Sequence, residues 1–116
     1  MSLEADQIRL ESILEWIKEL EWIIAKHGSV DKVLKDREGE YASSLCLLQI
    51  GEIVGTLQSA EILASIPARE IKSFRNLIVH NYGTVNLQIV KGVLLTDIPE
   101  LRVIIETILK SKKEPS

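Results

Sequence analysis

The segment from Arg75 to Tyr82 gathers the side chains of this 116-residue chain that are best suited to chemistry. It reads Arg-Asn-Leu-Ile-Val-His-Asn-Tyr, so that polar residues flank an apolar triplet. The guanidinium fork of Arg75 can hold a phosphate through two parallel hydrogen bonds, which a lysine cannot reproduce. The imidazole of His80 can take and return a proton near neutral pH. Together, these two side chains suit the cleavage of a phosphodiester bond.

Helical geometry brings only part of this segment onto one face. Asn76 and His80 are four residues apart and share a face, whereas Arg75 is displaced from His80 by about 140° and must curl back. Composition and spacing alone favour a structural interpretation, in which Arg75 is solvated and His80 interacts with the dipole at the helix C-terminus. Tyr82 would then be a buried cap whose hydroxyl bonds to the backbone.

Several other kinds of site are excluded by the residue inventory. The chain has two histidines, one cysteine and no glycine-rich phosphate loop, so Walker and dinucleotide-binding folds are excluded. Ile24 and Leu77 stand three residues before His27 and His80, where a ferritin-like metal site would need glutamates. One cysteine and two separated histidines do not supply a zinc ligand set. We therefore expect neither a metal nor a cofactor.

The remaining reactive or aromatic residues have structural interpretations. Cys46 lies in an apolar run, Leu-Cys-Leu-Leu, and is expected to be a buried thiol. His27 stands at an expected helix end, before Gly28, and is interpreted as structural. Trp16 and Trp22 lie on different faces of the first helix and are assigned to the core and an interface rather than to base stacking.

Charge and hydropathy predict a soluble, folded chain with one local basic segment. The formal net charge is −3 and the pI is near 5.4, which disfavours a broad surface for duplex DNA. Hydrophobic residues make up 46% of the chain and the mean hydropathy is +0.12, values too apolar for a disordered chain. Within residues 69–91, Arg69, Lys72, Arg75 and Lys91 face only Glu70, so positive charge is concentrated there.

The same composition bears on location. No apolar stretch reaches the eighteen or more residues that span a bilayer, so we expect no transmembrane helix. The N-terminus carries acidic residues where a secretory signal would be basic, and residues 1–3 are interpreted as a candidate cloning remnant. A single cysteine fits a reducing compartment. The expected location is the cytoplasm.

The elements that must position the candidate residues are all expected to be helices. Apolar residues recur at spacings of three and four along most of the chain. The expected helices are separated by a C′ glycine at Gly28, a polar break at 36–40 and a helix-start signal that ends in proline at 96–99. These are expected from about 8 to the C′ glycine at 28, at 30–35, 41–63, 68–81 and 86–94, and from about 98, before a frayed tail at 111–116.

This pattern predicts an all-α, up-and-down bundle of five or six helices in a single domain spanning 1–116. Gly51 and Gly55 lie four apart in the long central helix, where each costs about 1 kcal/mol relative to alanine. We therefore expect another backbone to approach that face closely, in a tight helix crossing.

The motif Arg75-x-x-x-x-His80-x-Tyr82, with Asn76 after the arginine, resembles the signature of the HEPN superfamily. Specifically, it resembles HepT-like ribonuclease toxins that are encoded beside MntA-like nucleotidyltransferase antitoxins. Three further segments are similar to recurrent positions of that family: 50–52, 66–71 and 97–101. The chain departs from the family at Ala68, where a tryptophan is common, and around Gly92, where an aromatic residue is expected.

The resemblance implies a HEPN-like fold and a metal-independent endoribonuclease that acts as a homodimer. One His80 would remove the proton from the ribose 2′-OH, and the partner's copy would protonate the leaving 5′ oxygen. Arg75 would bind the scissile phosphate, and Asn76 would orient His80 or a phosphate oxygen. Lys72, from the same basic segment, is assigned to substrate binding. Unpaired RNA is the expected substrate, whereas DNA lacks the attacking hydroxyl.

The resemblance also implies a regulatory partner. In the resembling family, the tyrosine that corresponds to Tyr82 is adenylylated by the MntA-like nucleotidyltransferase. AMP on Tyr82 would place phosphate charge and a bulky base beside Arg75, in the position of the substrate.

Two other functions stay open at the level of sequence. One is a helical accessory subunit that holds a nucleotidyltransferase or its substrate and cleaves nothing. The other is a dimeric four-helix interaction module in which Gly51 and Gly55 form the contact between subunits. Cleavage and binding of RNA would distinguish these two from the nuclease.

Overall fold

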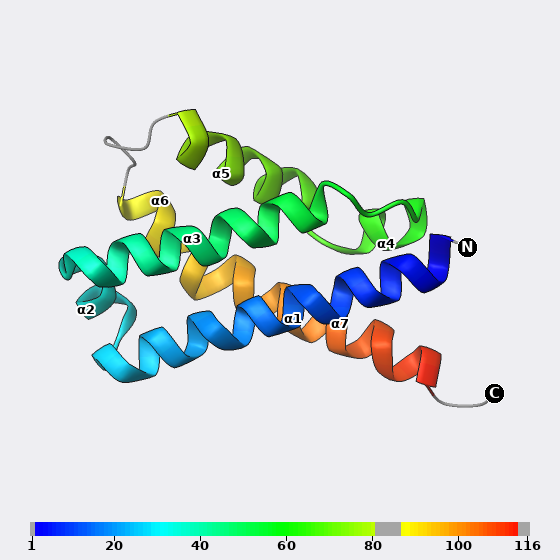
Figure 1. Cartoon of the computed structure of the whole chain (residues 1–116), viewed down its shortest axis with the longest axis horizontal. Coiled ribbons are helices and arrows are strands. Elements are labelled where there is room, and N and C mark those ends of the chain that lie inside the picture. Colours follow the sequence, from blue (N-terminus) through cyan, green and yellow to red (C-terminus); the bar gives the residue numbers. More distant parts are fainter. Residues whose placement is uncertain (1, 81–86, 114–116) are drawn as a thin grey trace.

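The computed structural model describes residues 2–80 and 87–113, and every element within these ranges is helical, which confirms the all-α prediction. Helices α1 and α3 run antiparallel side by side, α5 packs on α3, and α7 packs on α1 (Figure 1). The elements are α1 (Ser2–His27), α2 (Val30–Lys35), α3 (Arg37–Val54), α4 (Ala60–Ser65), α5 (Ala68–His80), α6 (Leu87–Gly92), the π-helix η1 (Val93–Asp97) and α7 (Ile98–Lys113).

The core is built on the apolar stripe of α1. Leu10, Ile13, Ile17 and Leu20 recur at spacings of three and four and are all fully buried. Each such side chain contributes about 1.5–3 kcal/mol by leaving water, so this face fixes α1 against its neighbours. Among the residues that the structure describes, no helix is both long enough and apolar enough to span a membrane.

The end of α1 follows the sequence prediction. Gly28 has a φ of 102°, a left-handed conformation that a C′ glycine adopts without strain. The Ser29 hydroxyl then accepts a hydrogen bond from the backbone N–H of Lys32 at 3.1 Å and caps α2.

The start of α3 corrects the polar break predicted at 36–40. Only Asp36 is outside a helix there, and its carboxylate accepts the N–H of Gly39 at 2.8 Å as an N-cap. A Cβ on Gly39 would lie 2.7 Å from the carbonyl oxygen of Val33, so a glycine is required. The polar residues after Asp36 therefore form the first turn of α3 instead of a loop.

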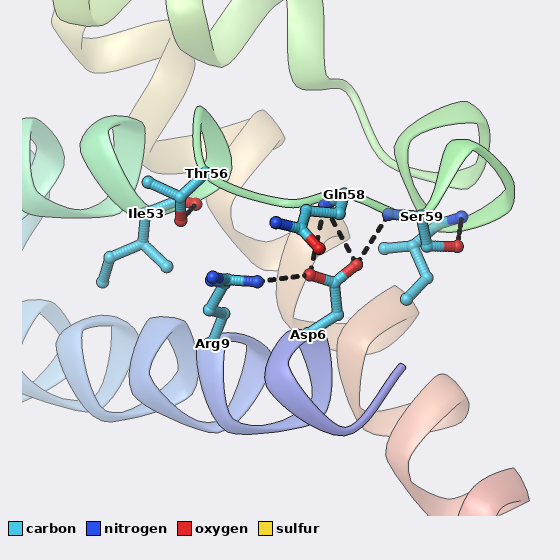
Figure 2. A network of polar contacts seen from close by, with 7 residues as sticks. Asp6, Arg9, Ile53, Thr56, Gln58 and Ser59 are labelled. Atoms are coloured by element: carbon cyan, nitrogen blue, oxygen red, sulfur yellow. Dashed lines mark hydrogen bonds and ion pairs between the residues drawn. The ribbon is translucent and has the colours of Figure 1, made fainter. Parts of the chain in front are cut away.

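The single helix predicted at 41–63 is also wrong, because α3 ends at Val54. Gly55 caps it, and its N–H donates to the Gly51 carbonyl at 3.0 Å. Leu57, in the connection, and Ile62, in α4, are both buried. The apolar pattern therefore continues past the end of α3 although the helix does not. The buried carboxylate of Asp6, on α1, accepts hydrogen bonds from the backbone N–H groups of Gln58 and Ser59, which lie between this turn and α4 (Figure 2).

The last helices are joined without the predicted interruption at 96–99. α6, η1 and α7 follow one another directly, and the wide π turn of η1 comes just before Pro99. A proline clashes with the carbonyl four residues earlier in a regular helix, and here that residue lies in η1. Asn86, the predicted cap of α6, lies outside the described residues. α7 extends to Lys113, three residues into the segment expected to fray.

Candidate functional site

The site forms where α5 crosses α3. A Cβ placed on Gly51 would lie 2.5 Å from Cβ of Arg75 and 3.6 Å from the Ile71 carbonyl oxygen, so α5 sits directly on this glycine. This confirms the tight crossing predicted at Gly51. The prediction was wrong for Gly55, which is exposed at the end of α3 and meets only its own chain segment.

The position of Gly51 also corrects one of the alternative functions. The interaction module required Gly51 and Gly55 to form a contact between subunits. α5 of the same chain already occupies the Gly51 face, so this face is not available to a second copy.

Two side chains hold the guanidinium of Arg75. Nε and Nη2 both contact Oε1 of Glu52, on α3, and Nη1 donates to Oδ1 of Asn76 at 2.9 Å. A guanidinium has five N–H groups, and one edge, between Nε and Nη2, faces the carboxylate. Nη1 and Nη2 each keep one further N–H that can be donated to a phosphate.

These residues line an open hollow of about 230 Å³ between the two helices. The Arg75 side chain is 34% exposed, so its charge is anchored and still accessible to a solute. Lys72, one turn earlier on α5, is exposed and lines the same hollow, and its assignment to substrate binding stays a prediction. The lining residues are Gly51, Glu52, Gly55, Thr56, Lys72, Arg75 and Asn76.

The structure describes His80 only as the last residue of α5. It lies five residues, or about 7.5 Å of helix rise, beyond Arg75. Tyr82, the predicted modification site, lies outside the described residues. The roles assigned to these two side chains therefore stay predictions.

The basic segment does not form one positive patch. Lys72 and Arg75 share the hollow, but Lys91 is paired with Asp31 of α2 at 2.9 Å. Arg69 instead lines a second hollow, of about 680 Å³, between α5 and the η1 region. That hollow also contains Asp97, whose pKa is raised by burial and by neighbouring glutamates.

The residues interpreted as structural have structural partners. Cys46 is buried, and burial raises the pKa of its thiol to about 11. His27 bridges two helices: Nδ1 lies 2.8 Å from the Ile23 carbonyl oxygen and Nε2 lies 3.0 Å from Oδ2 of Asp36. Both nitrogens face acceptors, so the imidazolium satisfies both, and these contacts raise the pKa of His27 above 6.5.

Of the two tryptophans, Trp16 is partly buried against the core. Trp22 is 61% exposed, and the Lys26 ammonium lies 5.1 Å from its ring centroid. The exposed position of Trp22 is consistent with the interface assignment, which stays a prediction. In the part of the chain that the structure describes, no three His, Cys, Asp or Glu side chains converge as metal ligands would.

Sequence reasoning gave no role to two carboxylates. Glu52 carries the contact to Arg75, and its only signal was its place in the segment 50–52 that resembles the family. Asp6 is fully buried, and its signal was its position four residues before Leu10, on the apolar stripe of α1. A charged residue on such a stripe needs partners, and Asp6 has them in Arg9 and the backbone after α3.

Comparison with known proteins gives consistent findings. Residues 13–108 match a family model described as "Ribonuclease HepT-like". The chain is also 33% identical over 108 residues to a protein of Caldanaerobacter subterraneus subsp. tengcongensis named "Putative RNase TTE0752", with 90% of this chain and 94% of that protein covered. No solved structure matches.

Proposed function

Because the chain belongs to the HepT-like ribonuclease family, we propose that it is an endoribonuclease whose active site surrounds Arg75. One observation carries the proposal: Arg75, Asn76 and Lys72 meet in a single open hollow inside the segment that matches the family. Lys72 and Arg75, the latter paired with Glu52, place two cations and one carboxylate beside an amide, which suits a phosphate rather than an apolar ligand.

The proposed reaction needs no metal. The ribose 2′ oxygen attacks the phosphorus atom while a neutral His80 takes the 2′-OH proton, and the bond from phosphorus to the 5′ oxygen breaks. A protonated His80 gives its proton to the departing 5′ oxygen, so the products are a 2′,3′-cyclic phosphate and a 5′-OH. Arg75 holds the phosphate and stabilises the charge that develops on its oxygens. Asn76 orients the guanidinium and the scissile group.

An acid and a base are both required, and each chain supplies one His80 in its motif. We therefore propose a homodimer with a two-fold axis, in which two motifs meet over one nucleotide linkage. The substrate is unpaired RNA, because in-line attack by the 2′ oxygen requires a backbone that can leave A-form geometry. DNA is not cleaved, since it has no 2′-OH.

We also propose that the protein is a toxin paired with an MntA-like nucleotidyltransferase antitoxin, which attaches AMP to Tyr82. The adenylate phosphate would compete with RNA for Arg75. Incubation with such a partner and ATP, followed by mass measurement, is expected to show one adenylate on Tyr82. No mass increase, or an adenylate at another residue, would contradict the modification.

The activity itself is tested with variants of the motif. His80→Ala is expected to abolish cleavage of unpaired RNA while the far-ultraviolet circular dichroism stays unchanged. Arg75→Lys keeps the charge but loses the fork, and it is expected to lower kcat about a hundredfold, typical of losing one preorganised donor. A wild type that binds RNA and never cuts it would instead support the accessory subunit.

A further inference from the structure

A second hollow lies next to the one around Arg75, between α3 and α1. It has a volume of about 340 Å³ and is lined by Ile8, Arg9, Ser12, Glu52, Ile53 and Thr56. Glu52 and Thr56 line both hollows, so the two hollows are adjacent at the C-terminal end of α3. We call the second hollow, with the six residues that line it, the α1 groove.

Arg9 is held in this groove by a fixed carboxylate. Asp6 is fully buried and accepts the backbone N–H of Ser59 at 2.7 Å and that of Gln58 at 3.1 Å. Nη1 of Arg9 donates to Oδ1 of the same carboxylate at 2.9 Å. Figure 2 shows Arg9 rising from α1 beside Asp6, toward the end of α3 that carries Ile53 and Thr56.

This anchoring leaves most of the Arg9 guanidinium able to bind something else. Its side chain is 29% exposed, and Asp6 is its polar partner among the residues that the structure describes. One of five N–H groups is used for that contact. The arrangement parallels that of Arg75, which Glu52 anchors on the other side of α3. Each arginine is thus preoriented without being enclosed.

The two adjacent hollows together offer the two kinds of contact that a single-stranded nucleic acid uses. Lys72 and Arg75 line one hollow and Arg9 lines the other, so three cations flank the Glu52 carboxylate that the two hollows share. Ile8 is 68% exposed beside Arg9 and gives an apolar surface that a base can cover. A polyanion can contact both hollows at once, whereas a single phosphate reaches only one.

We propose that the α1 groove binds nucleotides that flank the cleaved linkage of unpaired RNA, with Arg9 contacting a backbone phosphate. This inference rests on the proposed function, and it assigns the path of the substrate beyond the reacting linkage. It makes Arg9 a substrate-binding residue that acts away from the chemistry.

The test compares a twelve-nucleotide unpaired RNA that the wild type cleaves with the dinucleotide that spans its cleaved linkage. Arg9→Gln is expected to raise KM for the longer RNA about tenfold and to leave KM for the dinucleotide within twofold. With a twelve-nucleotide RNA that carries a 2′-deoxy residue at the cleaved position, binding can be measured without cleavage. There, Arg9→Gln is expected to reduce the slope of log Kd against log salt by about 0.7, the value for one lost phosphate contact on a single strand.

Two further variants separate binding from folding. Ile8→Gln removes the apolar surface and is expected to weaken binding of the longer RNA, and Ile8→Glu, which adds a negative charge at the same exposed position, is expected to weaken it further. Arg102→Gln is the matched control, since Arg102 is similarly exposed and paired with Glu21, away from the groove. It is expected to leave the salt slope unchanged.

The possible outcomes are distinguishable. Equal KM increases for the long and short substrates would overturn the inference, because Arg9 would then act on the fold or the reacting linkage. An unchanged salt slope in Arg9→Gln would overturn it as well. A wild type that binds the longer RNA with an Arg9-dependent slope and does not cut it would retain the groove and refute the nuclease.

Discussion

Replacing Gly51 by alanine tests the helix crossing on which the site is built. The added methyl would lie 2.5 Å from Cβ and 2.9 Å from Cγ of Arg75, whereas ordinary contact begins at 3.4 Å. Both Arg75 atoms are close to the backbone, so α5 itself must move away from α3. Such overpacking costs about 1–3 kcal/mol, and alanine regains about 1 kcal/mol of helix propensity. We expect a net loss of about 1 kcal/mol in the free energy of unfolding.

Gly55→Ala is the matched control on the same helix. Gly55 has a φ of −64°, and its added Cβ would make only ordinary contacts, at 3.4 and 3.5 Å. This variant loses backbone freedom in the unfolded chain without strain, and it is expected to gain up to about 1 kcal/mol. Urea unfolding at equal protein concentration measures both variants, with the m-value as a check on two-state behaviour.

Gly51→Ala is also expected to affect activity. α5 carries Arg75 and His80, so a shift of this helix misplaces the guanidinium relative to Glu52. Gly51→Ala is expected to lower kcat, whereas Gly55→Ala retains it, although both glycines line the hollow. If Gly51→Ala were as stable and as active as Gly55→Ala, the close approach of α5 would be refuted.

Three other substitutions probe single contacts. Glu52→Gln keeps a hydrogen-bond acceptor for Arg75 but removes the charge, so steady-state kinetics should show kcat lowered about tenfold and KM not raised; a raised KM with unchanged kcat would contradict a positioning role. Protonated His27 stabilises the fold below pH 6.5, and the wild type loses this stabilisation as the pH rises through the raised pKa of His27. In urea unfolding, His27→Gln should therefore have a lower free energy of unfolding than the wild type at pH 5.5 and an equal one at high pH. A difference that does not change with pH would refute the protonated bridge. Burial alone would raise the pKa of Asp6, but hydrogen bonds from Ser59, Gln58 and Arg9 outweigh it and hold that pKa below 3.8. The stabilisation by Asp6 is therefore present above pH 3.8 and lost as the pH falls, and Asp6→Asn should lower the free energy of unfolding by about 2 kcal/mol at pH 7; no loss at pH 7 would contradict the network.

Much of the fold could be predicted because the signals are local. The stripe of α1, the positive-φ glycine at 28 and the Ser29 cap each depend on neighbouring residues, and the structure has them where the sequence places them. One boundary that was wrong depends on a distant group. α3 ends early in a turn that Asp6 secures from fifty residues away, and periodicity within residues 41–63 carries no sign of that contact.

In the site, too, residues of one local segment could be predicted and their long-range partner could not. The chemistry of Arg75 was predicted from its residue type, its site role and that of Asn76 from the family resemblance, and that of Lys72 from the basic segment; the structure brings the three to one hollow. Their partner Glu52 lies 23 residues earlier, and only the crossing at Gly51 brings the two segments together. The two glycines looked equivalent in sequence, but α5 covers one of them and the other caps α3. Tertiary packing, which spacing does not encode, decides which glycine matters.

Cleavage of a single modified linkage tests the central claim most directly. An unpaired RNA and the same RNA with one 2′-deoxy residue at the cleaved position are incubated with the protein in EDTA, and the products are identified by mass. We expect the first RNA to yield a 2′,3′-cyclic phosphate and a 5′-OH at an undiminished rate, and the second to stay intact at that linkage. Equal cleavage of both RNAs, or loss of all cleavage in EDTA, would contradict an endoribonuclease that works by attack of the 2′-OH beside Arg75.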